Sequence, residues 1–351
     1  VISCPCALVI SVPLSFFAGI GGASRAGILI KGGNYLEALA KADTVVFDKT
    51  GTLTKGSFHV TSVIPAEGFT KEDVLFYAAN AERYSTHPIG RSILRAFTGG
   101  GNTTEETDVH AMEENAGRGI SAHINSHFIL LGTHDLLTAK KTVGIPPIPH
   151  TGAVYLSVDG RFAGVIHVAD EIKEDAAEAV RALKERGIRE TVMLTGDSCP
   201  IGMSVGKSLG IDTIHAELLP QDKVAQVETR LAAQREGKTL AYVGDGINDA
   251  PVLARADVGI AMGALGSDAA IEAADVVLMT DEPKKIATAI DIARKTMRIA
   301  WQNIVFAIGI KGIVLVLGAL GYAGLWAAIF ADVGVTVLAV FNAMRALHVK
   351  E

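Results

Sequence analysis

The chain has 351 residues, of which 49% are hydrophobic and 20% are charged, and its mean hydropathy of +0.33 exceeds that of an ordinary soluble domain. The net charge of −6 and the lack of a basic run argue against a nucleic-acid partner. Three cysteines are too few for a disulfide framework. Membrane segments are therefore the first expectation.

Residues 1–20 form an apolar segment interrupted by Pro5 and Pro13, which predicts the second half of a broken transmembrane helix entering the cytoplasm. Cys4 and Cys6 flank the first proline. Because proline frees backbone groups and thiols favour soft metals, this pair predicts an intramembrane metal site; two buried structural cysteines are the alternative. The chain starts inside this segment, so we expect missing upstream sequence and no signal peptide.

The middle of the chain alternates short apolar strands with helices. Helical patterns at residues 174–185 and 221–234 separate several of the strands, which favours a parallel, doubly wound α/β sheet. The predicted strands are residues 44–47, 191–194, 240–243, 258–261 and 276–279.

Residues 55–167 separate the first of these strands from the others. This region has its own helical patterns, at residues 71–82 and 88–97, and its own strands, near residues 123–131 and 154–168. It therefore predicts an α+β domain inserted into the doubly wound domain.

Aspartates follow three of the predicted strands: Asp48, Asp197, and Asp245 with Asp249. Ligands of doubly wound sheets bind beyond the carboxyl ends of the strands, so these carboxylates should meet at one rim. They would repel one another without a cation, and Mg²⁺ suits such a set. The alternative is that each aspartate only forms a turn or caps a helix.

The residues beside Asp48 suit phosphoryl transfer. Its carboxylate could act as a nucleophile and form an aspartyl phosphate. Lys49, Thr50 and Thr52 could donate hydrogen bonds to the phosphoryl group, and Lys223 could add a positive charge. The alternative for Lys223 is a solvated helix lysine.

Two further apolar segments, residues 300–320 and 325–344, are long enough to span a bilayer. Basic residues flank the pair on both outer ends, which predicts that both ends are cytoplasmic. Lys311 and Asp332 lie inside these segments, where charges are costly and usually functional. An oxygen ligand from Asp332 beside two thiolates favours a divalent ion over copper(I); a structural Lys–Asp pair is the alternative.

Three motifs, "DKTGTLT" from Asp48, "TGD" from Thr195 and "GDGIND" from Gly244, together resemble the P-type cation-transporting ATPases. The resemblance covers essentially the whole chain and implies a haloacid-dehalogenase fold for the phosphorylation domain. It implies that Asp48 is the phosphorylated nucleophile and Asp245 a magnesium ligand, with Thr50 also near the ion. The residues it assigns to the phosphate site are Lys49, Thr50, Thr195, Gly196, Asp197, Lys223, Asn248 and Asp249.

The inserted region is similar to the nucleotide domain of the heavy-metal branch of this family. The resemblance implies that four residues bind ATP: Glu82, His87, Gly117 and Gly119. An imidazole and a carboxylate can hold adenine, and glycine allows close approach of the backbone. The family often follows with Gly-Asn, whereas this chain has Gly132 and Thr133.

Cys4-Pro5-Cys6 resembles the Cys-Pro-Cys of heavy-metal ATPases. The zinc, cadmium and lead exporters among them share Lys311 and an Asp-x-Gly, here Asp332 with Gly334. The resemblance implies Cys4, Cys6 and Asp332 as ligands of the transported ion and Lys311 as a gating counter-charge. Zinc, cadmium and lead stay open. A copper(I) exporter is the alternative, although its Tyr-Asn and Met-x-x-Ser-Ser signatures do not occur.

We therefore expect a C-terminal fragment of an ATP-driven metal exporter, multi-pass in a bacterial inner membrane with cytoplasmic catalytic domains. Its partners would be ATP, Mg²⁺, divalent metal ions, lipid, and an upstream actuator domain and helices of the same protein. The predicted parts are a half-helix and stalk (1–41), a phosphorylation domain (42–57 and 168–295), a nucleotide domain (58–167), two transmembrane helices (296–345) and a cytoplasmic tail (346–351).

Two other classes of protein remain as alternatives. A haloacid-dehalogenase-type phosphatase fused to membrane helices would usually carry a second aspartate two residues after its nucleophile, where this chain has Thr50. A membrane metal sensor with a decayed ATPase domain would not need the four rim aspartates. Labelling by the γ-phosphate of ATP would separate both from a transporter.

Overall fold

The computed structural model describes residues 6–104, 107–115, 118–147, 152–245, 249–263 and 268–348. The chain forms two compact units. The first comprises Val1–Leu53, Lys173–Asp197 and Gly202–Glu351, and the second comprises Thr54–Ile172 and Ser198–Ile201. The chain passes from the first unit into the second at residues 53–54 and returns at residues 172–173. The sequence analysis placed these boundaries of the insertion at 57–58 and 167–168.

The first unit contains a sheet of seven strands within the described residues, in the order β1-β13-β12-β11-β2-β9-β10. All neighbours pair in parallel except β1, which is antiparallel to β13. The prediction of a doubly wound sheet is confirmed. The strands are β1 (Ile28–Ile30), β2 (Ala42–Asp48), β9 (Glu190–Leu194), β10 (Thr213–His215), β11 (Thr239–Gly244), β12 (Val258–Met262) and β13 (Val276–Leu278).

The central strands are buried along their whole length, as expected for parallel strands covered on both faces. Val46, Tyr242 and Val192 form one core with Val227 of the covering helix α8. The edge strand β1 was not predicted, because its three residues lie in what was expected to be a stalk. The helices of this part are α2 (Gly33–Lys41), α6 (Ala176–Glu185), α7 (Cys199–Leu209), α8 (Pro220–Ala232), α9 (Ala250–Leu253) and α10 (Asp268–Ala273).

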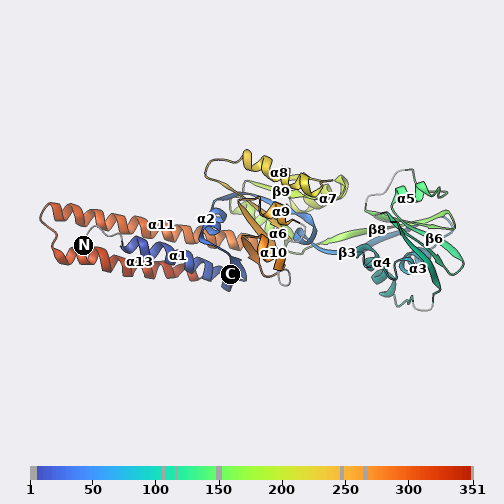
Figure 1. Ribbon diagram of the computed structural model, residues 1–351, viewed down its shortest axis with the longest axis horizontal. Helices are drawn as coiled ribbons and strands as arrows, with labels where there is room; N and C mark the ends of the chain where they lie inside the picture. Colours follow the sequence, from blue (N-terminus) through green and yellow to red (C-terminus); the bar gives the residue numbers. More distant parts are fainter. Residues whose placement is uncertain are drawn as a thin grey trace. The chain divides into compact units, whose positions relative to one another are not determined.

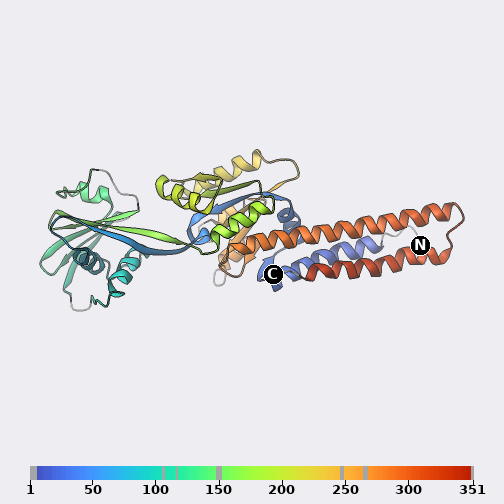
Figure 2. The same ribbon diagram turned by 180° about the vertical axis from the view of Figure 1, so that it is seen from behind.

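Three described helical segments are long and apolar enough to cross a membrane: Ala7–Arg25, Lys284–Ala319 and Leu325–Leu347. They belong to α1 (Cys6–Arg25), α11 (Lys284–Ala319) and the run of α12 (Leu325–Ile329), a wide turn (Phe330–Gly334), α13 (Val335–Met344) and a final 3₁₀ turn (Arg345–Leu347). Helices α1, α11 and α13 run side by side in both views (Figures 1 and 2).

Helix α1 continues through Pro13 and the glycines that follow, to Arg25. The predicted segment therefore ends later than residue 20. Helix α11 is also longer than predicted: it starts at Lys284, so the expected boundary at residues 295–296 falls inside one continuous helix of 36 residues.

Arg294 anchors the base of α11 to the sheet. Its guanidinium donates to the carbonyl of Ala40 at 3.3 Å, to that of Ala42, the first residue of β2, at 3.3 Å, and to that of Arg186 after α6. Asp291, one turn earlier on α11, accepts from Arg186 Nε at 2.7 Å. The helix that carries Lys311 is thus bonded to the strand that ends in Asp48.

The second unit is an antiparallel sheet of six described strands in the order β3-β8-β7-β6-β5-β4, with helices α3 (Lys71–Ala81), α4 (Pro88–Thr98) and α5 (His134–Ala139). Thr70 and Asp73 form a reciprocal cap at the start of α3. The strands are β3 (Thr54–Pro65), β4 (Val109–Asn115), β5 (Gly119–Ile124), β6 (His127–Gly132), β7 (Ala153–Val158) and β8 (Arg161–Ile172).

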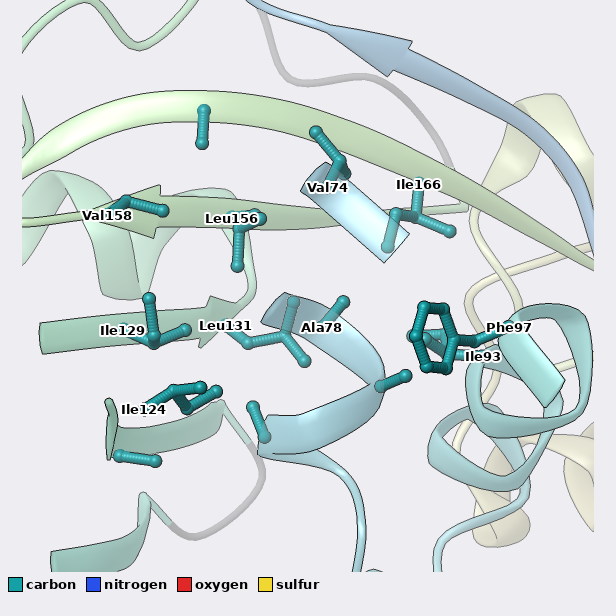
Figure 3. Close-up of a cluster of buried hydrophobic side chains, with 14 of the residues drawn as sticks. Val74, Ala78, Ile93, Phe97, Ile124, Ile129, Leu131, Leu156, Val158 and Ile166 are labelled. Carbon is teal, nitrogen blue, oxygen red and sulfur yellow. The ribbon is translucent and has the colours of Figure 1, made fainter. Parts of the chain in front are cut away.

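The core of this unit lies between α3, α4 and the sheet. Figure 3 shows Val74 and Ala78 of α3 and Phe97 of α4 beside strand residues that include Ile129 and Leu156. Their neighbours Leu130 and Tyr155 are buried as well, in a second cluster with Leu136 and Leu137 of α5, so this part of the sheet is covered on both faces. The predicted α+β character of the inserted region agrees with this arrangement.

Candidate active site and metal-ion cavity

The sheet order places Asp48 at the centre of the rim. Strand β2 lies between β9 and β11, and Asp48 pairs with Leu194, the last residue of β9. The turn after β9 carries Asp197, and the turn after β11 carries Asp245 and Asp249. Because all three strands are parallel, their following turns meet at one edge, as predicted from the sequence.

Two lysines bind the rim carboxylates. Lys223 Nζ, from the first turn of α8, donates to Asp48 Oδ1 at 2.5 Å and to Asp249 Oδ1 at 2.9 Å. Lys49 is almost fully buried and forms an ion pair with Asp197. Both lysines are therefore part of the rim, and the solvated alternative for Lys223 does not hold.

The charges at the rim shift the pKa values of its groups. Burial raises the pKa of Asp48 from 3.8 to about 7; the negative charges of Asp249 and Asp245 add to this effect, and Lys223 opposes it. Burial alone would lower the pKa of Lys223, but the charges of Asp48 and Asp249 outweigh it and raise that pKa. The four aspartates of the rim thus carry more negative charge than Lys49 and Lys223 compensate.

The other predicted rim residues differ in exposure. Thr50 is exposed, whereas Thr195 is 2% exposed and its Oγ1 accepts from the backbone N–H of Asp197 at 3.1 Å. Gly196 is exposed in the same turn. Asn248 lies outside the described residues, so its predicted role stays a prediction.

Sequence reasoning missed two buried residues at this rim. Tyr242, on β11, is fully buried; burial and the nearby charges of Asp48 and Asp249 raise its pKa. Lys173 donates to the carbonyl of Gly51 at 3.1 Å and to Asp281 Oδ1 at 2.6 Å, which connects the turn after Asp48 to the segment that follows β13. No signal in the sequence separates Tyr242 from an ordinary strand residue.

The donor set of the rim fits Mg²⁺. Gly51 has φ +73°, a conformation that glycine adopts without strain, and the turn that it forms lies against Asp245. Within the described residues, no three His, Cys, Asp or Glu side chains form a ready metal cluster. Mg²⁺ commonly takes only one or two carboxylates and completes its shell with water and phosphate oxygens. Asp48 and Asp245 provide two such carboxylates.

The second unit contains a cavity of about 340 Å³ that suits a nucleotide. Three of the four predicted contacts line it: Glu82, His87 and Gly119. His87 caps α4, and its Nδ1 accepts from the N–H of Ile89 at 3.3 Å. Burial raises the pKa of Glu82, against a hydrogen bond from Ser85 and the charge of His87. Gly117 lies outside the described residues.

Two glycines face each other at the wall of this cavity. A Cβ on Gly119 would lie 2.1 Å from the carbonyl of Leu131, and one on Gly132 would lie 2.2 Å from the carbonyl of Arg118. Both positions therefore require glycine. Thr133, where the family often has asparagine, lines the cavity and uses its Oγ1 to accept from the N–H of Leu136 at 3.3 Å, which caps α5.

A second cavity, of about 240 Å³, lies among the membrane-type helices. Lys311 and Asp332 both line it, and Lys311 Nζ lies 3.8 Å from Asp332 Oδ1. Asp332 lies in the wide helical turn Phe330–Gly334, a kind of turn that often occurs at functional sites. Cys4 lies outside the described residues; Cys6 starts α1, but its side chain is not described. Their role as ligands stays a prediction.

The residues that form the sheet rim and the two cavities lie in regions of the chain that are similar to known proteins. A sequence profile of haloacid dehalogenase-like hydrolases matches residues 42–257, from the start of β2 to beyond β11. The chain belongs to the haloacid dehalogenase-like hydrolases. The matched residues include Asp48, Lys223 and Asp249 and the whole inserted unit. The predicted fold class is confirmed.

Similarity extends beyond the hydrolase region. The chain is 58% identical over 350 residues to a cadmium, zinc and cobalt-transporting ATPase of Bacillus subtilis (strain 168), covering 100% of this chain and 49% of that protein. It is 54% identical over 345 residues to a zinc-transporting ATPase of Synechocystis sp. (strain ATCC 27184 / PCC 6803 / Kazusa), covering 98% of this chain and 47% of that protein. The chain thus spans about half the length of these curated relatives.

Solved structures extend this similarity to the helices. A zinc-transporting PIB-type ATPase in the E2.Pi state matches with a TM-score of 0.83 and 38% identity, covering 99% of this hydrolase family member and 57% of that chain. The catalytic domain of the CPx-ATPase CopB-B matches with a TM-score of 0.62 and 27% identity, covering 76% and 96% of the respective chains. The predicted resemblance to heavy-metal P-type ATPases is confirmed.

Proposed function

We propose that the chain is the catalytic and ion-binding part of an ATP-driven exporter of a divalent soft metal ion, zinc, cadmium or lead. One observation carries the proposal: a single compact unit holds both a carboxylate–lysine rim and a membrane-type cavity with its own lysine and aspartate. A soluble-type phosphatase needs only the first of these. The relatives named for zinc and cadmium transport support the same function.

Asp48 is proposed as the nucleophile. Its carboxylate oxygen attacks the γ-phosphorus of ATP, the bond from that phosphorus to the β,γ-bridging oxygen breaks, and ADP leaves with the electron pair. Lys223 and Lys49 hold the neighbouring charges, and the Thr195 turn donates to the phosphoryl oxygens. A magnesium ion held by Asp48, the Thr50 backbone and Asp245 would neutralise phosphate charge. Glu82, His87, Gly117 and Gly119 are proposed to bind the nucleotide.

Hydrolysis of the aspartyl phosphate needs a base that this rim does not supply at the usual place. Thr50 occupies the position where soluble phosphatases of this fold carry a second aspartate, and a hydroxyl is not a general base near neutral pH. We infer that the base comes from an actuator domain of the same protein, as the resemblance implies. The phosphorylated state should therefore persist when that domain is inactive.

Transport is proposed to pass through the Lys311–Asp332 cavity. Asp332, Cys4 and Cys6 would bind the ion, since mixed sulfur and oxygen donors suit zinc, cadmium and lead. When no ion is bound, Lys311 pairs with Asp332. Basic residues at the outer ends of both C-terminal helices support cytoplasmic catalytic domains and a multi-pass location, which we place in a bacterial inner membrane.

The test is phosphorylation of the full-length gene product by ATP labelled at the γ-phosphate. We expect an acid-stable, hydroxylamine-labile adduct whose formation and turnover depend on zinc, cadmium or lead and much less on copper(I). Asp48→Asn is the matched control and should carry no label. Label in that variant, or turnover stimulated by copper(I) alone, would contradict the proposal.

A further inference from the structure

A buried polar cluster joins the three membrane-type helices on the side of the cavity nearer the sheet. We call it the helix clamp; it consists of Ser15 of α1, Asn303 of α11, and Asn342 with the carbonyl of Ala339 of α13. Ser15 and Asn303 are 0% and 1% exposed, although the surrounding helices are mostly apolar. Nothing in the proposed reaction uses these side chains.

Asn303 is the centre of the clamp. Its Nδ2 donates to Ser15 Oγ at 3.3 Å and to the carbonyl of Ala339 at 3.0 Å, and its Oδ1 accepts from Asn342 Nδ2 at 2.9 Å. One amide thus bonds all three helices. Asn342 Oδ1 in turn accepts from Arg345 Nη1 at 2.7 Å, which connects the clamp to the basic end of the last helix.

Such a cluster has a definite energetic meaning among apolar helices. Lipid tails are as apolar as leucine, so burial alone does little to fix how membrane helices pack, and interhelical hydrogen bonds then help to decide which packing is stable. Buried amides that lose a partner are costly, because no water replaces it. The clamp therefore penalises any sliding or rotation of one helix against the other two.

The clamp and the ion pair lie on the same helices, about two turns apart. Asn303 and Lys311 are eight residues apart on α11, or about 12 Å along the axis, and Ala339 follows Asp332 by seven residues. Ala307 lies between Asn303 and Lys311 in sequence, and Val335 between Asp332 and Ala339; with Ala7 they form one small buried cluster, of which Ala7 and Ala307 also line the cavity. These short side chains let the helices approach closely, so displacement at the clamp is transmitted to the cavity.

We propose that Asn303 is a positioning residue for the metal cavity, a role that rests on the proposed transport function. By fixing α1, α11 and α13 together, it holds Lys311 beside Asp332 and sets the geometry in which a divalent ion is bound. It does not contact the ion. The clamp thereby affects how tightly the ion binds more than how fast Asp48 is phosphorylated.

The test measures zinc dependence of turnover in the full-length protein for Asn303→Leu, Ser15→Ala and Asn342→Leu. We expect Asn303→Leu to raise the zinc concentration for half-maximal turnover at least tenfold, with the maximal rate within threefold of wild type, and the other two variants to have smaller effects. Ser15→Ala combined with Asn303→Leu should equal Asn303→Leu alone, because one hydrogen bond cannot be lost twice. Thr296→Val is the matched control: it removes a buried hydroxyl of α11 that donates to the carbonyl of Ile292 in the same helix, and it should match wild type.

A second measurement does not depend on transport. Ala307→Cys with Val335→Cys places a cysteine pair between α11 and α13 at the wall of the cavity, and Asn303→Leu should slow its oxidative cross-linking in membranes at least fivefold. Unchanged cross-linking, or an unchanged zinc dependence in a well-folded Asn303→Leu protein, would overturn the inference. A wild-type protein without zinc-dependent turnover would instead refute the proposed function. If Asn303→Leu still slowed cross-linking in that case, the clamp would fix the helices without any role in metal binding, and the inference would be overturned as well.

Discussion

The sheet rim and the membrane-type cavity each pair a lysine with an aspartate, but the two pairs differ in tightness. At the rim, Lys223 Nζ lies 2.5 Å from Asp48 and 2.9 Å from Asp249, and its side chain is 13% exposed. In the cavity, Lys311 Nζ lies 3.8 Å from Asp332, with side-chain exposures of 21% and 19%. The cavity beside this second pair has a volume of about 240 Å³.

The shorter distances and lower exposure of Lys223 indicate a lysine that is held permanently, whereas Lys311 is held more weakly. Lys223 bridges two buried carboxylates, so removing it leaves two negative charges together, which is strongly unfavourable. Lys311 lies at a longer distance from Asp332, beside open space, so the proposed divalent ion would displace a more weakly held lysine there. The same pair of residue types thus suits permanent charge balance at the rim and, in the proposed function, competition with a metal ion in the cavity.

The largest effect should come from breaking the rim at its nucleophile. Asp48→Asn should lower phosphorylation by ATP at least 10³-fold, because an amide cannot form the acyl phosphate. Nucleotide binding, measured with a fluorescent ATP analogue, should stay within twofold of wild type. Asp43→Asn is the matched control, since Asp43 is buried at the other end of β2 and pairs with Arg235 at 2.6 Å; its phosphorylation should remain.

Breaking the cavity should abolish metal stimulation without destroying the rim. Asp332→Ala removes a proposed ligand, so zinc-stimulated ATP hydrolysis should fall about 100-fold while nucleotide binding is unchanged. Hydrolysis with and without zinc is the measurement. Normal zinc transport into vesicles by this variant would show that the divalent site lies elsewhere.

Exchanging the two lysines for methionine sharpens the comparison. Lys223→Met should slow phosphorylation about 10²–10³-fold, since it removes charge stabilisation at the reacting group, and leave the zinc dependence of the residual rate unchanged. Lys311→Met should leave phosphorylation within about threefold but slow ion release. Rapid-quench phosphorylation and single-turnover zinc release separate the two effects. Equal loss of phosphorylation in both variants would contradict the distinction.

The smallest effect concerns pH and stability without Mg²⁺. The pKa of Asp48 is about 7 in the folded protein and 3.8 in the reference state, so the folded state binds the proton more tightly. Raising the pH from 4 to 7 therefore destabilises the wild type relative to Asp48→Asn. Thermal unfolding in detergent should show the variant melting on the order of 5 °C higher at pH 8 and with little difference at pH 4. A difference that shrank as pH rose would contradict the assigned pKa.

The rim was predictable from sequence because its chemistry lies at strand ends. Asp48, Asp197 and Asp245 each follow a short apolar run, and parallel strands must end at one edge. Lys311 and Asp332 were also visible, since a charge in an apolar segment stands out. The sequence did not show the distances within these pairs. Only the fold shows that Lys223 lies within 2.9 Å of two carboxylates, whereas Lys311 lies 3.8 Å from Asp332.

Other features depend on contacts that no local pattern encodes. Strand β1 has three residues and pairs with β13, about 250 residues later, so its apolar pattern alone did not predict a strand. Tyr242 resembles any buried strand residue until its neighbours are known. The helix clamp was missed for the same reason, because Asn303 has meaning only through partners on α1 and α13.

Helix α11 is anchored to the sheet at Arg294, far from the residue that it presents to the cavity. Seventeen residues separate Arg294 from Lys311, or about 26 Å at 1.5 Å per residue. A tilt of α11 by only about 5° at Arg294 therefore displaces Lys311 by about 2 Å, a large part of the 3.8 Å that separates it from Asp332. Because Arg294 is bonded to the first residue of the strand that ends in Asp48, a tilt of α11 at its base would change the distance of the ion pair, and the helix clamp at Asn303 opposes that change.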